Sequence, residues 1–275
     1  MTVAVDALPV PRRVDDDRTA FTRQVLALSK RSILAIYRQP ALVAPSLIFP
    51  LFFAALGASS FDRATALPGF PQVDSFLSFS LAGSITQGVL FGSVTGGAAL
   101  ATDIEDGFFD RLLASPTSRV GILIGRLAGA AVFGAFQALF FTLVLMPFGV
   151  SVEAGVVGLM VIVLAGAATG MAIGGFTAAM ALKTGSSEAV QGSFPLLFIA
   201  LFFSSAFFPR ETMQGVYQTI ANVNPVSHLV EGLRGLVIDG LTWGNVAKAV
   251  LVPVGIGVFS IALAMRTLAG RLAAR

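Results

Sequence analysis

Residues 103–126, DIEDGFFDRLLASPTSRVGILIGR, form a charged island between two long apolar runs. Asp103 is a candidate N-cap with Asp106 as its capping-box partner, and acidic residues are favoured near the N-terminus of a helix by its dipole. Pro116 disfavours the α conformation at the residue before it, which predicts that this helix ends near Ala114. The apolar side chains of such a helix share one half of its surface: Ile104, Phe108, Phe109, Leu112 and Leu113. The pattern therefore predicts an amphipathic helix beside a membrane.

The composition of the whole chain is typical of an integral membrane protein. Of its 275 residues, 55% are hydrophobic and 12% are charged, and the mean hydropathy is +0.84. Ordinary soluble domains carry about 25% charged residues. The chain has no cysteine, which excludes disulfides and thiolate metal sites. The net charge of +3 fits basic residues that face an anionic lipid leaflet, and no basic surface indicates nucleic-acid binding.

Six apolar runs are long enough to cross about 30 Å of hydrocarbon, which takes about 20 helical residues. They lie near 41–60, 76–102, 120–150, 155–182, 189–208 and 245–265. If the N-terminus is inside, the 18 Lys and Arg residues all lie on the inner side except Arg63, Arg210, Arg234 and Lys248. The prevalence of Arg over Lys is typical of a GC-rich bacterial genome. We therefore predict a multi-pass protein of the bacterial cytoplasmic membrane with both termini in the cytoplasm.

Two segments outside these runs also show helical amphipathicity. Residues 19–37 interleave apolar and basic side chains, which predicts an N-terminal interfacial helix; the alternative is a solvated helix without a partner. Residues 209–244 mix apolar and charged side chains and are split by Pro225, which predicts two short helices at the outer interface. The first forty residues lack the apolar core of a signal peptide. The predicted organisation is a cytoplasmic tail and interfacial helix over 1–40, followed by a six-span domain over 41–275.

The predicted spans lack the groups that would let this chain power transport alone. No Asp, Glu, His, Lys or Arg lies near the middle of a span, so the proton relay of a secondary transporter is missing. None of the three lysines belongs to a phosphate-binding GxxxxGK[ST] loop. No intramembrane carboxylate pair indicates an enzyme, and His228, the only histidine, has no metal-binding companion. Transport by this chain would therefore need energy from another subunit.

The residues from Glu105 to Arg126 resemble the signature of ABC transporter type-2 permeases, in particular the drug-resistance exporter branch. The pattern is an acidic pair, a glycine, an apolar pair, Asp-Arg-Leu-Leu, Ser-Pro-x-Ser-Arg and an apolar turn that ends in Gly-Arg. A second stretch, NPVSH at 224–228 followed by EGLRGL at 231–236, is similar to the motif that precedes the last span of this family. Many members carry a basic residue where this chain has Ile104.

The resemblance implies a separate ATPase subunit, which binds ATP and Mg²⁺ and docks on a coupling helix over 103–114. This chain would then hold no cofactor or metal of its own. The residues assigned to coupling are Glu105, Asp106, Phe108, Phe109, Asp110, Arg111, Leu112 and Leu113. The apolar ones either enter a groove of the ATPase or brace the spans, and the charged ones set the register; alternatively, the helix only anchors a loop. Pro116, Arg119 and Arg126 would form the loop and the entry into the membrane.

Polar and aromatic residues within the spans are candidates for a substrate pathway. The candidates are Gln87, Gln137, Phe198, Phe202 and Ser204. The polar ones can instead form hydrogen bonds between helices, and the phenylalanines can face lipid or the core. The resemblance also implies that the helices over 209–244 re-enter the membrane and gate release. The gate candidates are Asn224, Pro225, Glu231 and Arg234.

Glycines recur at every fourth position in two of the apolar runs. One set occupies 121, 125 and 129, and the other occupies 166, 170 and 174. Small residues at this spacing let helix backbones approach closely in lipid. The contact would lie within one subunit, at an interface between subunits or on a helix that slides during transport.

The sequence thus predicts an all-α integral membrane protein with six transmembrane helices, an interfacial helix, a coupling helix and short re-entrant outer helices. The predicted function is that of the permease subunit of an ATP-driven exporter for a hydrophobic or amphiphilic drug or antibiotic. The expected partners are an ABC ATPase, a second copy of the permease and membrane lipids. The alternatives are export of a lipid or lipid-linked glycan, and a non-transporting sensor or immunity subunit.

Overall fold

The computed structural model describes residues 14–37, 40–66, 68–114 and 118–273, and all regular secondary structure in these ranges is helical. The α-helices are α1 (Val14–Tyr37), α2 (Pro40–Phe61), α3 (Phe76–Glu105), α4 (Phe108–Ala114), α5 (Arg119–Leu145), α6 (Gly155–Thr184), α7 (Ser187–Gln191), α8 (Phe194–Phe202), α9 (Gly215–Val223), α10 (Pro225–Ile238) and α11 (Trp243–Ala273). Short 3₁₀ turns are η1 (Asp62–Ala66), η2 (Met146–Phe148) and η3 (Arg210–Thr212). The all-α prediction is confirmed for the described part of the chain.

Five helices in the described ranges are long and apolar enough to cross a membrane: α2, α3, α5, α6 and α11. The run predicted as a span over 189–208 is instead divided between α7 and α8. The N–H of Gly192 closes α7 on the carbonyl of Glu188 (2.8 Å), and Pro195 in the first turn of α8 has no N–H with which to continue the helix. Five of the six predicted runs are therefore candidate spans by length and composition, and the run over 189–208 forms two shorter apolar helices.

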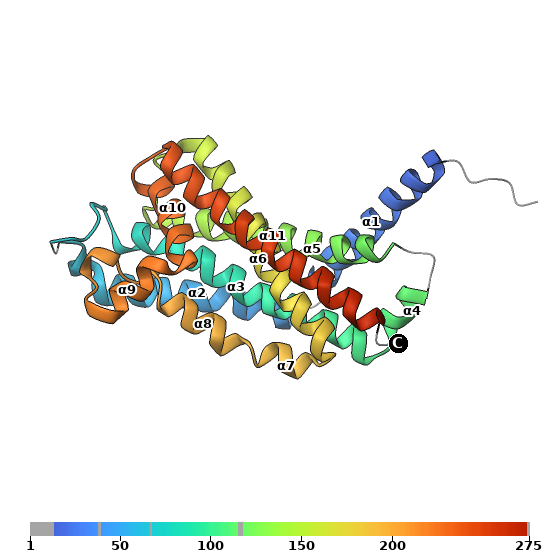
Figure 1. Ribbon diagram of the computed structural model, residues 1–275. Helices are drawn as coiled ribbons and strands as arrows, with labels where there is room; N and C mark the ends of the chain where they lie inside the picture. Colours follow the sequence, from blue (N-terminus) through green and yellow to red (C-terminus); the bar gives the residue numbers. More distant parts are fainter. Residues whose placement is uncertain (1–13, 38–39, 67, 115–117, 274–275) are drawn as a thin grey trace, which may run out of the picture.

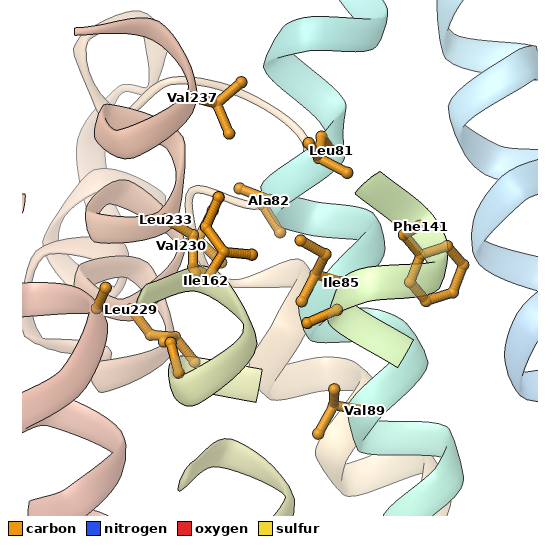
Figure 2. Packing of buried hydrophobic residues seen from close by; sticks show 14 of the residues in the cluster. Leu81, Ala82, Ile85, Val89, Phe141, Ile162, Leu229, Val230, Leu233 and Val237 are labelled. Atoms are coloured by element: carbon orange, nitrogen blue, oxygen red, sulfur yellow. The ribbon is translucent and has the colours of Figure 1, made fainter. Parts of the chain in front are cut away.

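The central helix of the bundle is α3. In its most apolar window 89% of the residues are buried, against 22% in α2 and in α11, whose outward faces carry large apolar side chains. It packs against α2, α5, α6, α7 and α10. Figure 2 shows the contact of α3, α5, α6 and α10 through Leu81, Ala82, Ile85, Val89, Phe141, Ile162, Leu229, Val230, Leu233 and Val237. Residues far apart in the sequence thus form one apolar core around α3.

Both glycine stripes allow close contact between helices of the same chain. On α5, a Cβ added to Gly125 would lie 2.6 Å from Cβ of Leu28, so α1 packs directly on the α5 backbone. On α6, a Cβ added to Gly166 would lie 2.6 Å from the carbonyl oxygen of Gly134 in α5. Packing within one subunit is therefore confirmed for both stripes. The same contact gives α1 a partner and removes the solvated-helix alternative.

Gly166→Ala is expected to lower the free energy of unfolding by roughly 1–3 kcal/mol, because the added methyl group overlaps the α5 backbone. Thermal unfolding of the detergent-solubilised protein, followed by size-exclusion chromatography, measures the effect. Gly255→Ala in α11 is the matched control, since no atom lies within 4 Å of its added Cβ. Equal melting temperatures for the two variants would contradict the close α5–α6 contact.

The two ends of the bundle differ in what they carry. At one end lie α4, the start of α5 and the C-terminal end of α11, and α1 extends beside them (Figure 1). At the opposite end lie η1, α9 and the connection into α10 (Figure 1). We name these the α4 end and the α9 end. Both functional motifs of the sequence map to these ends, one to each.

Candidate functional site

The helix expected over 103–114 is divided by a turn at Gly107. Helix α3 continues to Glu105, and the separate helix α4 begins only at Phe108. Gly107 has a φ of +68°, a left-handed conformation that glycine adopts at little cost and that ends α3. The predicted helix start at Asp103 is therefore wrong, because residues 103–105 still belong to the last turn of α3.

The apolar face of α4 packs on the bundle. Phe109 is 3% exposed and belongs to a buried cluster with side chains of α3, α5, α6 and α11, and Leu112 and Leu113 pack against that cluster. Of the two roles considered for these residues, the structure thus shows bracing of the spans. Arg111 on α4 and Asp106 in the turn that precedes α4 are exposed. The exposed part of this segment consequently carries charge.

The neighbours of α4 in sequence complete this end of the bundle. Helix α4 ends at Ala114, as predicted, and Pro116 lies outside the described residues. Ser118 caps α5 by accepting a hydrogen bond from the N–H of Gly121 (3.1 Å), and Arg119 follows as the exposed first residue of the helix. Arg119 therefore stands at the entry to α5, where the sequence predicts it.

Asp103 joins three helices through two arginines. Its Oδ1 lies 3.1 Å from Nη2 of Arg31 in α1, and its Oδ2 is ion-paired with Arg126 in α5. The side chains of Asp103 and Arg126 are 19% and 17% exposed, so the pair is largely shielded from water. The guanidinium of Arg31 also lies 4.1 Å from the ring centroid of Phe108, which extends the cluster to α4. Burial lowers the pKa of Arg31, which remains protonated at neutral pH.

Asp103 and Arg31 were not predicted from the sequence as members of a site. Asp103 is a carboxylate in the last turn of a buried span, and such a group requires a partner. The position of this carboxylate at the end of an apolar run could have indicated a partner. Instead, Asp103 was interpreted as the N-cap of a new helix. The third member, Arg126, was identified only as a residue of the membrane entry.

Glu105 also has a partner within the chain. Its Oε1 accepts a hydrogen bond from the N–H of Ser187 at 2.7 Å, and its Oε2 accepts one from the Ser187 hydroxyl at 3.0 Å. A carboxylate at this position satisfies a free N–H in the first turn of α7. Glu105 therefore ties the end of α3 to the start of α7.

An open cleft of about 1140 Å³ begins at the Asp103 cluster and extends toward α8. Asp103, Arg31 and Arg126 line it at the α4 end. Deeper in the bundle it is lined by Phe91, Phe194 and Phe198, among other residues. The ring centroids of Phe91 and Phe194 are 4.6 Å apart, and those of Phe91 and Phe198 are 5.7 Å apart. The cleft thus combines charged residues at the α4 end with aromatic residues beside α8, and it contains one predicted pathway residue, Phe198.

The other predicted pathway residues lie elsewhere. The amide nitrogen of Gln137 donates to the carbonyl of Gly88 (2.8 Å) and to the hydroxyl of Ser46 (3.1 Å), so Gln137 joins α5 to α3 and α2. Gln137 also lines a cavity of about 80 Å³ that shares Ser32 and Arg126 with the cleft. Gln87 and Phe202 line a separate cavity of about 240 Å³, and Ser204 is buried and lines none of the three. The five candidates therefore do not share one cavity.

At the α9 end, the chain is split at Pro225 into α9 and α10, as expected. The side-chain amide of Asn224 donates to the carbonyls of Ala200 (2.7 Å) and Phe203 (2.9 Å), and its oxygen caps α10. In α10, Glu231 is ion-paired with Arg210 and lies 4.0 Å from Nζ of Lys248. These contacts fasten α10 to the segment that follows α8 and to α11.

Arg234 is the most deeply placed charge of α10. It is 5% exposed, and its guanidinium donates to the carbonyls of Phe79 (3.2 Å) and Ser205 (2.8 Å). It also lies 3.7 Å from the ring centroid of Phe79. Burial lowers the pKa of Arg234 to about 10, while the negative charge of Glu231 opposes the shift. Arg234 thus remains charged at neutral pH and fixes α10 against α3.

Comparison with known proteins supports the sequence motifs. The family model described as ABC-2 type transporter matches residues 23–238. The chain is 28% identical over 240 residues to a daunorubicin resistance ABC transporter permease protein of Streptomyces coeruleorubidus, covering 86% of this chain and 82% of the relative. It is 27% identical to a putative transport permease of Pyropia yezoensis, with coverages of 78% and 74%. A probable doxorubicin resistance permease of Mycobacterium tuberculosis is 26% identical, with coverages of 60% and 65%.

Proposed function

The chain belongs to the ABC-2 type transporter family, and on this premise we propose that it is the membrane-spanning subunit of an ATP-driven exporter of hydrophobic or amphiphilic drugs or antibiotics. A separate ABC ATPase would bind ATP and Mg²⁺, and two copies of this permease would form the complex. The α4 end and both termini would face the bacterial cytoplasm. Drug-resistance permeases among the relatives support this cargo class.

The observation that carries the proposal is the open cleft of about 1140 Å³. Asp103 and Arg126 line one part of it, and Phe91, Phe194 and Phe198 line another. An amphiphilic cation or polar headgroup is favoured beside such charges, while an apolar ring system is favoured against the phenylalanines. A path from the α4 end to the middle of the bundle is what uptake of cargo from the cytoplasmic side requires.

Two features support a coupling role for α4. Phe109 holds α4 in the bundle, so a displacement of α4 would be transmitted to the spans. Arg111 on α4 and Asp106 in the preceding turn are exposed and would be available to a partner. Phe108 connects α4 to Arg31, and Arg31 connects to Asp103 in α3. ATP-driven movement of the ATPase would thus reach α1 and α3 through this chain of contacts.

The double variant Asp106→Lys/Arg111→Glu is expected to reduce recovery of the ATPase at least about tenfold, since reversed charges at an interface cost several kcal/mol. The measurement is a pull-down of the detergent-solubilised chain from its native cells, with mass spectrometry of the proteins that co-purify. Lys183→Glu is the matched control, because Lys183 is exposed in the last turn of α6 and lies outside α4. Recovery of the ATPase with both variants would remove α4 as the docking element.

Transport itself is tested in inside-out vesicles that contain the permease and the recovered ATPase. Daunorubicin is a suitable fluorescent probe, because one relative is described as a resistance permease for it. ATP-dependent accumulation of the drug supports export. An ATPase that co-purifies but drives accumulation of neither drugs nor fluorescent lipids would favour a sensor or immunity subunit. Accumulation of lipid alone would identify a lipid exporter.

A further inference from the structure

A second cavity, of about 240 Å³, lies toward the α9 end and shares no lining residue with the open cleft. Its aromatic wall is formed by Phe53, Phe61, Phe76, Phe202, Phe207, Phe208 and Tyr217. Phe76 belongs to α3, and Ser80, Ser84 and Gln87 follow it at helical spacing, which adds a polar stripe of the same helix to the lining. The cavity therefore combines aromatic rings with hydrogen-bonding groups.

Gln87 is the group in this cavity that lacks a partner. Its side chain is 1% exposed, and its amide nitrogen makes no hydrogen bond to any described residue. The amide nitrogen of Gln137, which is equally buried, donates twice, although its Oε1 accepts no hydrogen bond within the described residues. A buried donor left unsatisfied is costly, and such groups in folded proteins call for a specific explanation. An acceptor brought by a ligand would provide it.

The remaining polar group of the aromatic wall is already engaged. The hydroxyl of Tyr217 donates to the carbonyl of Phe202, so Tyr217 offers its ring to the cavity. The rings of Phe202 and Phe207 are stacked, with centroids 4.7 Å apart and planes inclined by 28°. A further aromatic ring can extend such an arrangement at favourable energy. Drug-sized ligands occupy pockets of about 300–1,000 Å³, so this cavity fits a more compact molecule.

We propose that this cavity binds a compact aromatic molecule that carries a hydrogen-bond acceptor, such as the oxygen of an aryl ketone or quinone, with Gln87 as the donor. The site deepens the proposed export function and rests on it for its role, which would be selection of cargo beyond the cleft. Binding itself requires neither ATP nor the ATPase. The two inferences can therefore fail separately.

The test uses the full chain in lipid nanodiscs and benzophenone, an aryl ketone that cross-links to nearby C–H groups under light. Mass spectrometry is expected to place the label on peptides containing Phe76, Gln87 and Phe202. 2-Acetylnaphthalene is expected to compete about tenfold better than 2-ethylnaphthalene, which has a similar shape but no acceptor. In Gln87→Leu the ketone should lose this advantage, and the two competitors should become equal.

A second variant keeps the test decisive if Gln87→Leu does not fold. Leu56 lines the cavity from the exposed side of α2, so Leu56→Trp is expected to fill it and to abolish benzophenone labelling of the peptides that contain Phe76, Gln87 and Phe202. Equal competition by the two compounds in the wild type, or a label confined to other helices, would overturn the proposal. ATP-driven export with no ketone preference would leave the export function standing and reject the site. A ketone-selective site in a chain that recovers no ATPase would support the site and contradict the export function.

Discussion

Arg234→Leu is expected to lower the free energy of unfolding by about 3–5 kcal/mol, one of the two largest effects of a single substitution in this chain. The guanidinium is buried, and its donors serve the carbonyls of Phe79 and Ser205. Leucine fills part of the space but leaves both carbonyls without their donor. It also removes the charge that lies over the Phe79 ring.

Two further variants separate the causes. Arg234→Lys keeps the positive charge but cannot reproduce the fork that reaches both carbonyls, so about half of the loss is expected. Arg210→Gln breaks the shielded ion pair with Glu231 at the same end, but Glu231 keeps Lys248 at 4.0 Å, so the cost should be about 1–2 kcal/mol, clearly less than that of Arg234→Leu. Thermal unfolding in detergent compares all three. A wild-type melting temperature for Arg234→Leu would show that α10 is held by its apolar face alone.

The elements that the sequence predicted correctly are those governed by hydropathy and by proline. Five apolar runs became long helices, and Pro225 divided the segment before the last of them. The run over 189–208 forms two short helices, because α7 closes at Gly192 and α8 begins again at Phe194. The prolines of a run do not predict such a break, since α2 continues through Pro45 and Pro50 and α11 continues through Pro253.

The candidate site was only partly accessible from the sequence, and Asp103 shows why. A capping rule considers four neighbouring residues, whereas the partners of Asp103 are 72 and 23 positions away, at Arg31 and Arg126. Arg234 poses the same difficulty, since the rule for basic residues assigns it to a side of the membrane but does not report burial. Burial and pairing of these charges are tertiary properties, and only the packed helices reveal them.

The second large effect is expected for Asp103→Asn. The substitution keeps the shape of the side chain but leaves Arg126 and Arg31 facing each other without a counter-charge. Removal of one partner from a buried pair costs about 3–5 kcal/mol, and the partial exposure of this cluster places the expected loss at about 2–4 kcal/mol. Glu105→Gln is the matched control, because an amide oxygen can still accept from Ser187, and its cost should stay below about 1 kcal/mol.

A double-mutant cycle shows whether the charge pair itself is responsible. Arg126→Leu removes one partner of Asp103 and leaves Asp103 paired with Arg31. The double variant Asp103→Asn/Arg126→Leu removes both members of the shielded Asp103–Arg126 ion pair. The double variant should therefore be more stable than the sum of the single losses predicts, by about 1–3 kcal/mol. Strict additivity would mean that the two residues do not act on each other.

A local readout distinguishes release of α1 from general destabilisation. The chain has no cysteine, so Leu28→Cys introduces a single thiol where α1 packs on Gly125. If Asp103 holds α1 through Arg31, the rate of maleimide labelling at this thiol should rise in Asp103→Asn under conditions where the protein remains folded. As a control, Gly255→Cys on α11 should be labelled at the same rate with Asp103 and with Asp103→Asn. Unchanged labelling of α1 would assign the lost stability to the α3–α5 contact alone. The proposed transmission of movement from α4 to α1 and α3 through Arg31 would then be contradicted.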